Sequence, residues 1–102
     1  MVRIVKYTEN TRRIYYIFVG FELWEDFDTL ANILLTQMDA KPLDQINGVY
    51  SRCSTFEIGN ISFNLLYHED IGNCLYSIHD SEAEINYLEN LAHRMLPYVL
   101  NP

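Results

Sequence analysis

At 102 residues, with 49% hydrophobic and 14% aromatic residues, the chain has the size and apolar content of one folded domain and is not intrinsically disordered. Its formal net charge of −7 argues against the basic surfaces that direct binding to nucleic acid or anionic lipid requires. No apolar run approaches the roughly 20 residues of a membrane span, and the N-terminus lacks the apolar block of a signal peptide, so we expect a soluble, cytoplasmic domain over residues 1–102.

Two N-terminal strands are predicted over residues 2–7 and 12–21, joined by a turn at residues 8–11. The second strand is apolar at every position from Ile14 to Val19. Such a run is typical of a central strand. We therefore expect this strand to be covered on both of its faces, at least in part.

A helix is predicted next, beginning near the acids Glu25, Asp26 and Asp28, because the helix dipole favours negative charge at a helix N-terminus. It is expected to end at Lys41-Pro42, since the residue before a proline is pushed out of the helical region. Its buried stripe recurs at helical spacing and consists of Phe27, Leu30, Ala31, Leu34 and Met38.

A polar loop through residues 44–48 leads to three further strands, predicted at about 49–58, 61–68 and 74–79. Gly59-Asn60 is a two-residue hairpin signal between the first two of these, because both residues tolerate the positive φ that such turns require. The strands after the first helix therefore follow one another as neighbours.

The last helix opens at Ser81, which is expected to form a capping box with Glu84. Pro97 either ends this helix or kinks its last turn. The predicted order is ββαβββα. The fold class is α+β, with a five-stranded, mainly antiparallel sheet and helices packed mainly on one face.

The hairpin registers predict which side chains share a face of the sheet. With Gly59-Asn60 as the turn, Phe56 lies opposite Phe63. With the next turn centred on Ile71-Gly72, Tyr67 lies opposite Tyr76, and Cys53 and Cys74 fall on opposite faces. The face expected under the helices collects Phe56, Ile58, Ile61, Phe63, Leu65, Tyr67, Cys74, Tyr76 and Ile78. The other face is expected to be mostly polar and open.

Charge is distributed unevenly along the chain. Four of the seven basic residues fall within the first thirteen positions, and no Lys or Arg occurs between Arg52 and Arg94. That interval contains Glu57, Glu69, Asp70, Asp80, Glu82, Glu84 and Glu89. An acidic body of this kind attracts basic proteins and accelerates encounter with them, although acidity also serves solubility alone.

Catalytic and metal signatures are weak. No Gly-x-Ser-x-Gly elbow or Gly-rich phosphate loop is present, so we expect no enzymatic activity and no cofactor. His68 and His79 are predicted roughly 13 Å apart, too far to share one metal ion, and no metal site is expected. The two cysteines are interpreted as structural thiols in a reducing compartment.

The chain contains eight tyrosines, and tyrosine is enriched at protein interfaces because its ring buries area while its hydroxyl finds a partner. Tyr50 and Tyr87 are expected to be the least buried. We predict one exposed patch of carboxylates and phenol rings that binds a partner. Its expected residues are Tyr67, His68, Glu69, Asp70, Asp80, Glu82, Glu84 and Tyr87.

The whole chain resembles the small acidic immunity proteins of bacterial toxin–immunity systems, including those of contact-dependent growth inhibition. The resemblance lies in its size, its alternating sheet with one helix midway and one at the C-terminus, and the run Leu66-Tyr67-His68-Glu69-Asp70-Ile71-Gly72-Asn73-Cys74-Leu75-Tyr76. It implies a cytoplasmic protein that binds and neutralises a cognate basic toxin domain, commonly a nuclease. The alternative is a regulatory or scaffolding subunit that pairs through its sheet, including as a homodimer.

Overall fold

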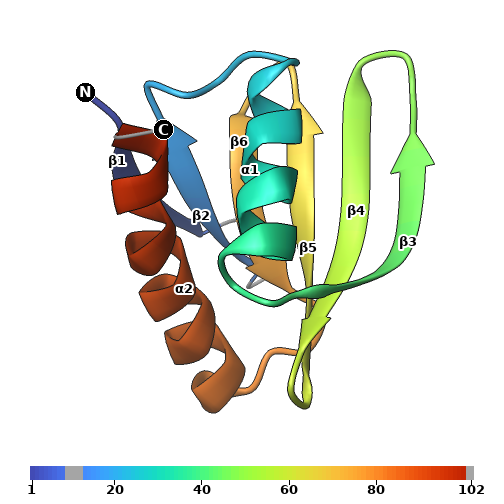
Figure 1. Cartoon of the computed structure of the whole chain (residues 1–102), viewed down its shortest axis with the longest axis vertical. Helices are drawn as coiled ribbons and strands as arrows, with labels where there is room; N and C mark the ends of the chain where they lie inside the picture. Colours follow the sequence, from blue (N-terminus) through green and yellow to red (C-terminus); the bar gives the residue numbers. More distant parts are fainter. Residues whose placement is uncertain (9–12, 101–102) are drawn as a thin grey trace.

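A computed structural model of the chain describes residues 1–8 and 13–100. It is an α+β fold in which one six-stranded sheet carries both helices on the same face (Figure 1). In chain order the elements are β1 Arg3–Thr8, β2 Ile14–Val19, α1 Asp26–Thr36, β3 Lys41–Asn47, β4 Ser51–Ile58, β5 Ile61–His68, β6 Gly72–Ser77 and α2 Glu82–Leu100. The turn predicted over residues 8–11 falls mainly on residues 9–12, which lie outside the described part.

The strands are arranged in the order β1-β2-β6-β5-β4-β3, and every neighbouring pair is antiparallel. The last strand, β6, therefore lies between the N-terminal hairpin and the β3–β5 meander. This placement makes the apolar β2 an inner strand, as its sequence predicts. β1 forms one edge of the sheet and β3 forms the other.

The sequence prediction missed β3 and extended the first helix too far. Helix α1 ends at Thr36, Asp39 takes a positive φ of 56°, and Lys41-Pro42 begin a strand instead of ending the helix. All seven residues of β3 are exposed. A strand with no buried side shows no apolar alternation, and for this reason the sequence predicts a polar loop there.

The core lies between the sheet and the two helices. The predicted stripe of α1 contributes the fully buried Leu30 and Leu34, and α2 contributes the fully buried Leu88 and Met95. The sheet side of the core is aromatic and aliphatic, and it is formed mainly by Tyr16, Phe18, Phe56, Phe63, Leu65 and Leu75. The hydroxyl of Tyr16 donates a hydrogen bond of 3.1 Å to the carbonyl of Ile85, which ties β2 to α2.

One predicted register is confirmed and the other is wrong. Phe56 pairs with Phe63 and Ile58 with Ile61 across the Gly59-Asn60 turn, as expected. In the next hairpin, however, Tyr67 pairs with Asn73 and not with Tyr76. The loop is shorter than predicted because His68 pairs directly with Gly72, and a shift of an odd number of residues turns every β6 side chain to the other face.

The corrected register changes the composition of both faces. Cys74 and Tyr76 move to the face away from the helices, while Asn73, Leu75 and Ser77 turn toward them. Cys53 and Cys74 consequently share one face, separated by Leu66 of β5, and no disulfide joins the two.

The last helix keeps the predicted start. The Ser81 hydroxyl accepts a hydrogen bond of 3.2 Å from the backbone N–H of Glu84, which is one half of the expected capping box. Pro97 does not end the helix, because α2 continues to Leu100 with Val99 packed into the core. No helix in the described part of the chain is long and apolar enough to cross a membrane.

Candidate partner-binding surface

Three connections meet at one end of the sheet, and we call this region the acidic end. They are the β2–α1 loop at residues 20–25, the β3–β4 loop at residues 48–50 and the β5–β6 turn at residues 69–71 (Figure 1). Together with the first turn of α1 they carry six carboxylates, those of Glu22, Glu25, Asp26, Asp28, Glu69 and Asp70.

Buried contacts fix these connections against one another. The side-chain amide of Asn73, which is fully buried, donates hydrogen bonds of 3.0 Å to the carbonyls of both Phe21 and Leu23. Gly72 has a φ of 88°, and a Cβ atom there would come within 3.0 Å of the Glu22 side chain. The β2–α1 loop therefore lies tightly on the start of β6, and larger residues at position 72 would displace it.

Arg52 joins the acidic end to the core. Its guanidinium binds Asp28 through two hydrogen bonds, Nη2–Oδ1 at 2.6 Å and Nη1–Oδ2 at 3.0 Å, and Nη1 also donates to the Trp24 carbonyl at 3.2 Å. Its Cζ lies 5.0 Å from the Trp24 ring centroid and 4.3 Å from that of Phe27. The arginine is thus held by charge and by cation–π contact at the same time.

The Arg52–Asp28 pair is asymmetric in its exposure. The Arg52 side chain is 10% exposed and that of Asp28 is 66% exposed. The hydrogen bond from Arg52 holds the pKa of the Asp28 carboxyl below its usual value, so this carboxylate remains charged at neutral pH. The buried cation therefore neutralises one carboxylate of the six.

The other five carboxylates have no Lys or Arg partner within the described residues. Glu22 and Asp26 accept backbone hydrogen bonds from Gly20 and Leu23, which fixes their positions without neutralising their charge. His68 lies beside Asp70, where its Nδ1 accepts a hydrogen bond of 3.1 Å from the backbone N–H of Asp70 and is 3.8 Å from the Asp70 Oδ2. The acidic end keeps a concentrated negative charge.

Exposed apolar side chains lie among these acids. Val49 is 81% exposed, Tyr50 64% and Trp24 41%, and Leu23 is also exposed. The Trp24 ring meets the Tyr67 ring edge-on at 5.4 Å. Tyr50 is connected to the acidic turn through its carbonyl, which accepts a hydrogen bond from the N–H of Glu69. The mixture of fixed acids and large exposed rings is typical of an interface and unlike a uniformly solvated surface.

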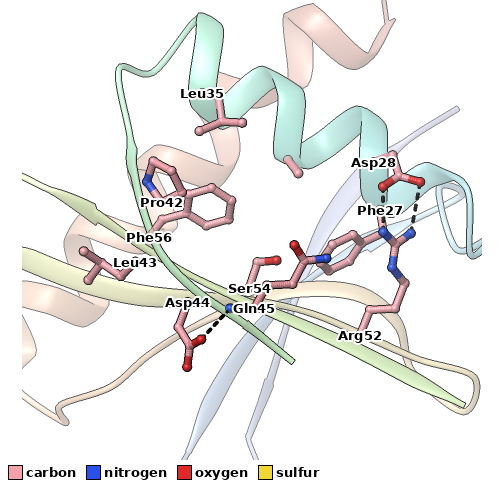
Figure 2. Close-up of a pocket in the computed structure, with 11 residues that line it drawn as sticks. Phe27, Asp28, Leu35, Pro42, Leu43, Asp44, Gln45, Arg52, Ser54 and Phe56 are labelled. Carbon is pink, nitrogen blue, oxygen red and sulfur yellow. Dashed lines mark hydrogen bonds and ion pairs between the residues drawn. The ribbon is translucent and has the colours of Figure 1, made fainter. Parts of the chain in front are cut away.

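A groove of about 350 Å³ opens between α1 and the β3–β4 hairpin, next to the acidic end (Figure 2). The Arg52–Asp28 pair lies at one end of the groove, and the exposed side chains of Leu35 and Leu43 border its opening. Its apolar lining consists of Phe27, Ala31, Leu35, Pro42, Leu43 and Phe56, and Ser54 and Gln45 add polar groups. The groove has room for one or two apolar side chains of a partner.

The structure divides the sequence-predicted binding residues into two groups. Tyr67, His68, Glu69 and Asp70 belong to the acidic end. Asp80, Glu82, Glu84 and Tyr87 lie at the start of α2, at the opposite end of the sheet, because β6 runs between the two groups (Figure 1). The six residues of β6 separate them by about 20 Å. The eight residues therefore do not form one continuous patch.

The group at the start of α2 is less exposed than expected. Tyr87 is half-buried, with the guanidinium carbon of Arg94 at 5.6 Å from its ring centroid. Glu84 is half-buried as well, and its acidic neighbours occupy the first turn of α2, where the helix dipole stabilises them. Stabilisation of the helix N-terminus therefore explains the acids at the start of α2, and no binding partner is needed to explain them.

Sequence reasoning missed half of the acidic end. The sequence predicts Glu25 and Asp26 only as part of a helix start and gives no binding role to Glu22 or Trp24. Their position beside Glu69 and Asp70 depends on the insertion of β6 next to β2. One signal was available, since the chain contains a single tryptophan and it lies within a run of acids.

The remaining candidate groups show no reactive arrangement. Burial raises the pKa of the Cys53 thiol, which makes it a poor nucleophile. Among the described residues, no three His, Cys, Asp or Glu side chains gather closely enough to hold a metal ion.

No family model matches the chain, and neither a curated protein nor a solved structure is similar to it.

Proposed function

We propose that this protein binds a basic protein through its acidic end and thereby neutralises it, as an immunity protein does for a cognate toxin domain. The observation that carries the proposal is the coincidence of five carboxylates that pair with no Lys or Arg of the described residues with the exposed side chains of Leu23, Trp24, Val49 and Tyr50. Its role is binding rather than catalysis, and it requires no cofactor.

The partner class follows from the charge. A nuclease presents Lys and Arg side chains to the phosphates of its substrate, so a rigid set of carboxylates is able to occupy those positions instead. Glu69 and Asp70 project from the turn, while Glu22 and Asp26 are held by backbone hydrogen bonds. Pre-positioned acids lose little side-chain entropy on binding, which favours affinity.

Apolar contacts supply the part of the binding free energy that the exposed charges do not. Rim charges raise the association rate more than the affinity, and buried aromatic anchors carry most of the binding energy. Trp24 and Tyr50 provide such anchors on this protein. The groove beside Arg52 offers a recess for an apolar side chain of the partner (Figure 2). A basic partner with an apolar residue next to its cations fits this surface.

The experiment identifies the partner and the end of the sheet that binds it. Tyr50 is replaced by the photoreactive residue p-benzoylphenylalanine, and the same replacement at Tyr87 serves as the control at the other end of the sheet. Irradiation in the native cells is expected to cross-link a basic protein from position 50 and not from position 87. Co-expression of this chain with the captured protein is then expected to relieve its inhibition of growth.

Two results would contradict the proposal. One is a captured partner without a basic surface. The other is a partner that cross-links from position 87 alone, which would move the interface to the start of α2.

A further inference from the structure

The sheet face turned away from the helices, called here the open face, carries a continuous row of apolar side chains. The strand registers place these residues side by side across all six strands, and we call them the apolar row: Val5, Ile17, Cys74, Leu66, Cys53 and Ile46. Both helices cover the other face (Figure 1). Ile46 at the end of the row is 68% exposed.

A second row lies beside the first and has two unlike halves. Tyr7, Tyr15 and Tyr76 form an aromatic half, with ring centroids 6.2 Å and 5.4 Å apart. The polar half continues across β5, β4 and β3 as Asn64, Thr55 and Asp44. Thr55 donates a hydrogen bond of 2.6 Å to Asn64. One half of this row therefore consists of phenol rings, of which that of Tyr7 is exposed, and the other half consists of polar side chains.

We propose that the open face binds the open face of a second copy of this chain, about a two-fold axis parallel to the strands. Such an axis lays the apolar row on itself in reverse order, so that Ile46 faces Val5 and Cys53 faces Ile17 of the other copy. It also lays the aromatic half of the second row over the polar half. Both rows on the open face of one copy are therefore complementary to the same two rows of the other copy.

Charge selects this axis over the one perpendicular to the strands. On the β1–β2 side of the open face lies Arg3, and on the β3–β4 side lie Asp44 and Glu57, with Lys41 next to Glu57. The parallel axis brings the basic side of one copy over the more acidic side of the other. The perpendicular axis would place like charges over like, which is unfavourable.

Pairing through the β3 edge of the sheet is less favourable than pairing through its face. The N–H of Gln45 on β3 is already occupied by the Asp44 carboxylate at 2.8 Å. Pro42 has no N–H to offer, and the strand register breaks between Pro42 and Asp44. These features protect an edge strand from adding another strand.

The size of the face sets the strength of the dimer. Six strands spaced about 4.8 Å apart and about 20 Å long give a face of roughly 500 Å², so a dimer buries roughly 1,000 Å² in total. That area is at the lower end of specific interfaces. We therefore expect a reversible dimer with a dissociation constant in the micromolar range.

The dimer is independent of the proposed function. An axis parallel to the strands leaves both acidic ends uncovered and at the same end of the dimer. A monomeric protein that still neutralises its partner would overturn the dimer alone, and a dimer that binds no basic protein would overturn the proposed function alone.

The test is sedimentation equilibrium of the purified chain from micromolar to millimolar concentration, using three variants. Ile46→Glu replaces an exposed side chain at the end of the apolar row, and Leu66→Glu places a charge at its centre. Val49→Glu is the matched control, since Val49 is still more exposed than Ile46 but lies off the open face. Wild type and Val49→Glu are expected to dimerise with equal affinity. Ile46→Glu is expected to weaken the dimer at least tenfold.

Leu66→Glu distinguishes the face from the edges, because edge pairing through backbone groups would survive it, and circular dichroism verifies that it folds. A wild-type chain that stays monomeric at millimolar concentration overturns the proposal. A dimer that withstands Ile46→Glu, or withstands Leu66→Glu in its folded form, overturns it as well, since its contact surface would then lie elsewhere.

Discussion

Arg52 shows at the residue scale how a buried charge organises an exposed surface. Taking a guanidinium out of water is unfavourable unless hydrogen bonds replace the lost hydration. Nη1 and Nη2 of Arg52 have such partners, while its buried Nε has none in the described structure. The Trp24 and Phe27 rings compensate in part through cation–π contact. Arg52 thus holds Trp24 and the first turn of α1 in place.

Asp28 is expected to stabilise the fold in a pH-dependent way. Because Arg52 lowers its pKa in the folded state, its contribution is present above the unfolded pKa and is lost as pH falls through the folded pKa. Asp28→Asn should lower the free energy of unfolding at pH 7 by about 1 kcal/mol, a modest value because the carboxylate is largely exposed. Urea denaturation at pH 7 and pH 3 measures the difference in the free energy of unfolding between wild type and Asp28→Asn.

The difference between wild type and Asp28→Asn should be smaller at pH 3 than at pH 7, because the contribution of the carboxylate is lost as pH falls from the unfolded pKa through the lowered folded pKa. Glu25→Gln is the control, since Glu25 is an exposed neighbour without an ion pair among the described residues. A difference that stays constant between pH 7 and pH 3 would show that the ion pair is not its cause.

Asn73 is expected to hold the β2–α1 loop in place. Asn73→Leu preserves the side-chain size and removes both hydrogen bonds to the loop carbonyls of Phe21 and Leu23. We expect a loss of about 1–3 kcal/mol in the free energy of unfolding, because the partly buried carbonyls lose their donor. Trp24 is the single tryptophan, so its fluorescence should shift to longer wavelength if the loop loosens.

Asn86→Leu on the exposed surface of α2 is the matched control for Asn73→Leu. It should change the stability by less than about 0.5 kcal/mol and leave the fluorescence unchanged. Unaltered stability and fluorescence in Asn73→Leu would mean that other contacts fix the loop.

At the scale of elements, the sequence predicted every strand and helix that has a buried side. Periodicity located α2 and β5, and turn chemistry placed the β4–β5 hairpin in its observed register. It failed at β3, which buries nothing, and at the β5–β6 turn, where Gly72 shortens the loop. Local sequence does not reveal either feature, because exposure and loop length are decided by tertiary packing.

The candidate surface was predictable only in part for the same reason. Glu69 and Asp70 stand in a turn that the sequence marks clearly. Their neighbours Glu22 and Trp24 lie almost fifty residues earlier, and only the β2–β6 pairing brings them close. The wrong β6 register also hid the apolar row, because it assigned Cys74 to the core face.

Pro97 is expected to weaken the helix that contains it. A proline inside a helix removes one backbone hydrogen bond and crowds the preceding turn. Pro97 is exposed, so Pro97→Ala removes no buried contact and should raise the free energy of unfolding by about 1–3 kcal/mol. Asn90→Ala, at another exposed position of α2, is the control and should change the stability by only a few tenths of a kcal/mol. Thermal denaturation compares the two.

A stability for Pro97→Ala equal to or below that of wild type would show that the last turn is already distorted enough to accommodate the proline. Val99 would then be held in the core by packing alone.

At the scale of the whole molecule, the position of the charge matters more than its total. The acidic end and the start of α2 both carry exposed carboxylates, and the length of the sheet separates them (Figure 1). A surface that steers a basic partner acts over about 10 Å at 0.1 M salt, which is shorter than this separation. Only the end that faces the partner should influence its approach.

Two double variants separate position from net charge. Glu69→Lys/Asp70→Lys reverses two exposed acids at the acidic end, and Asp80→Lys/Glu82→Lys reverses two at the other end, so both change the net charge equally. At low salt the first should slow association with the captured basic partner at least tenfold, and the second by less than threefold. Stopped-flow measurements from low salt to 0.5 M NaCl should show the rates converging as salt screens the charges. Equal slowing by both variants would mean that total charge, rather than a surface at the acidic end, drives the encounter.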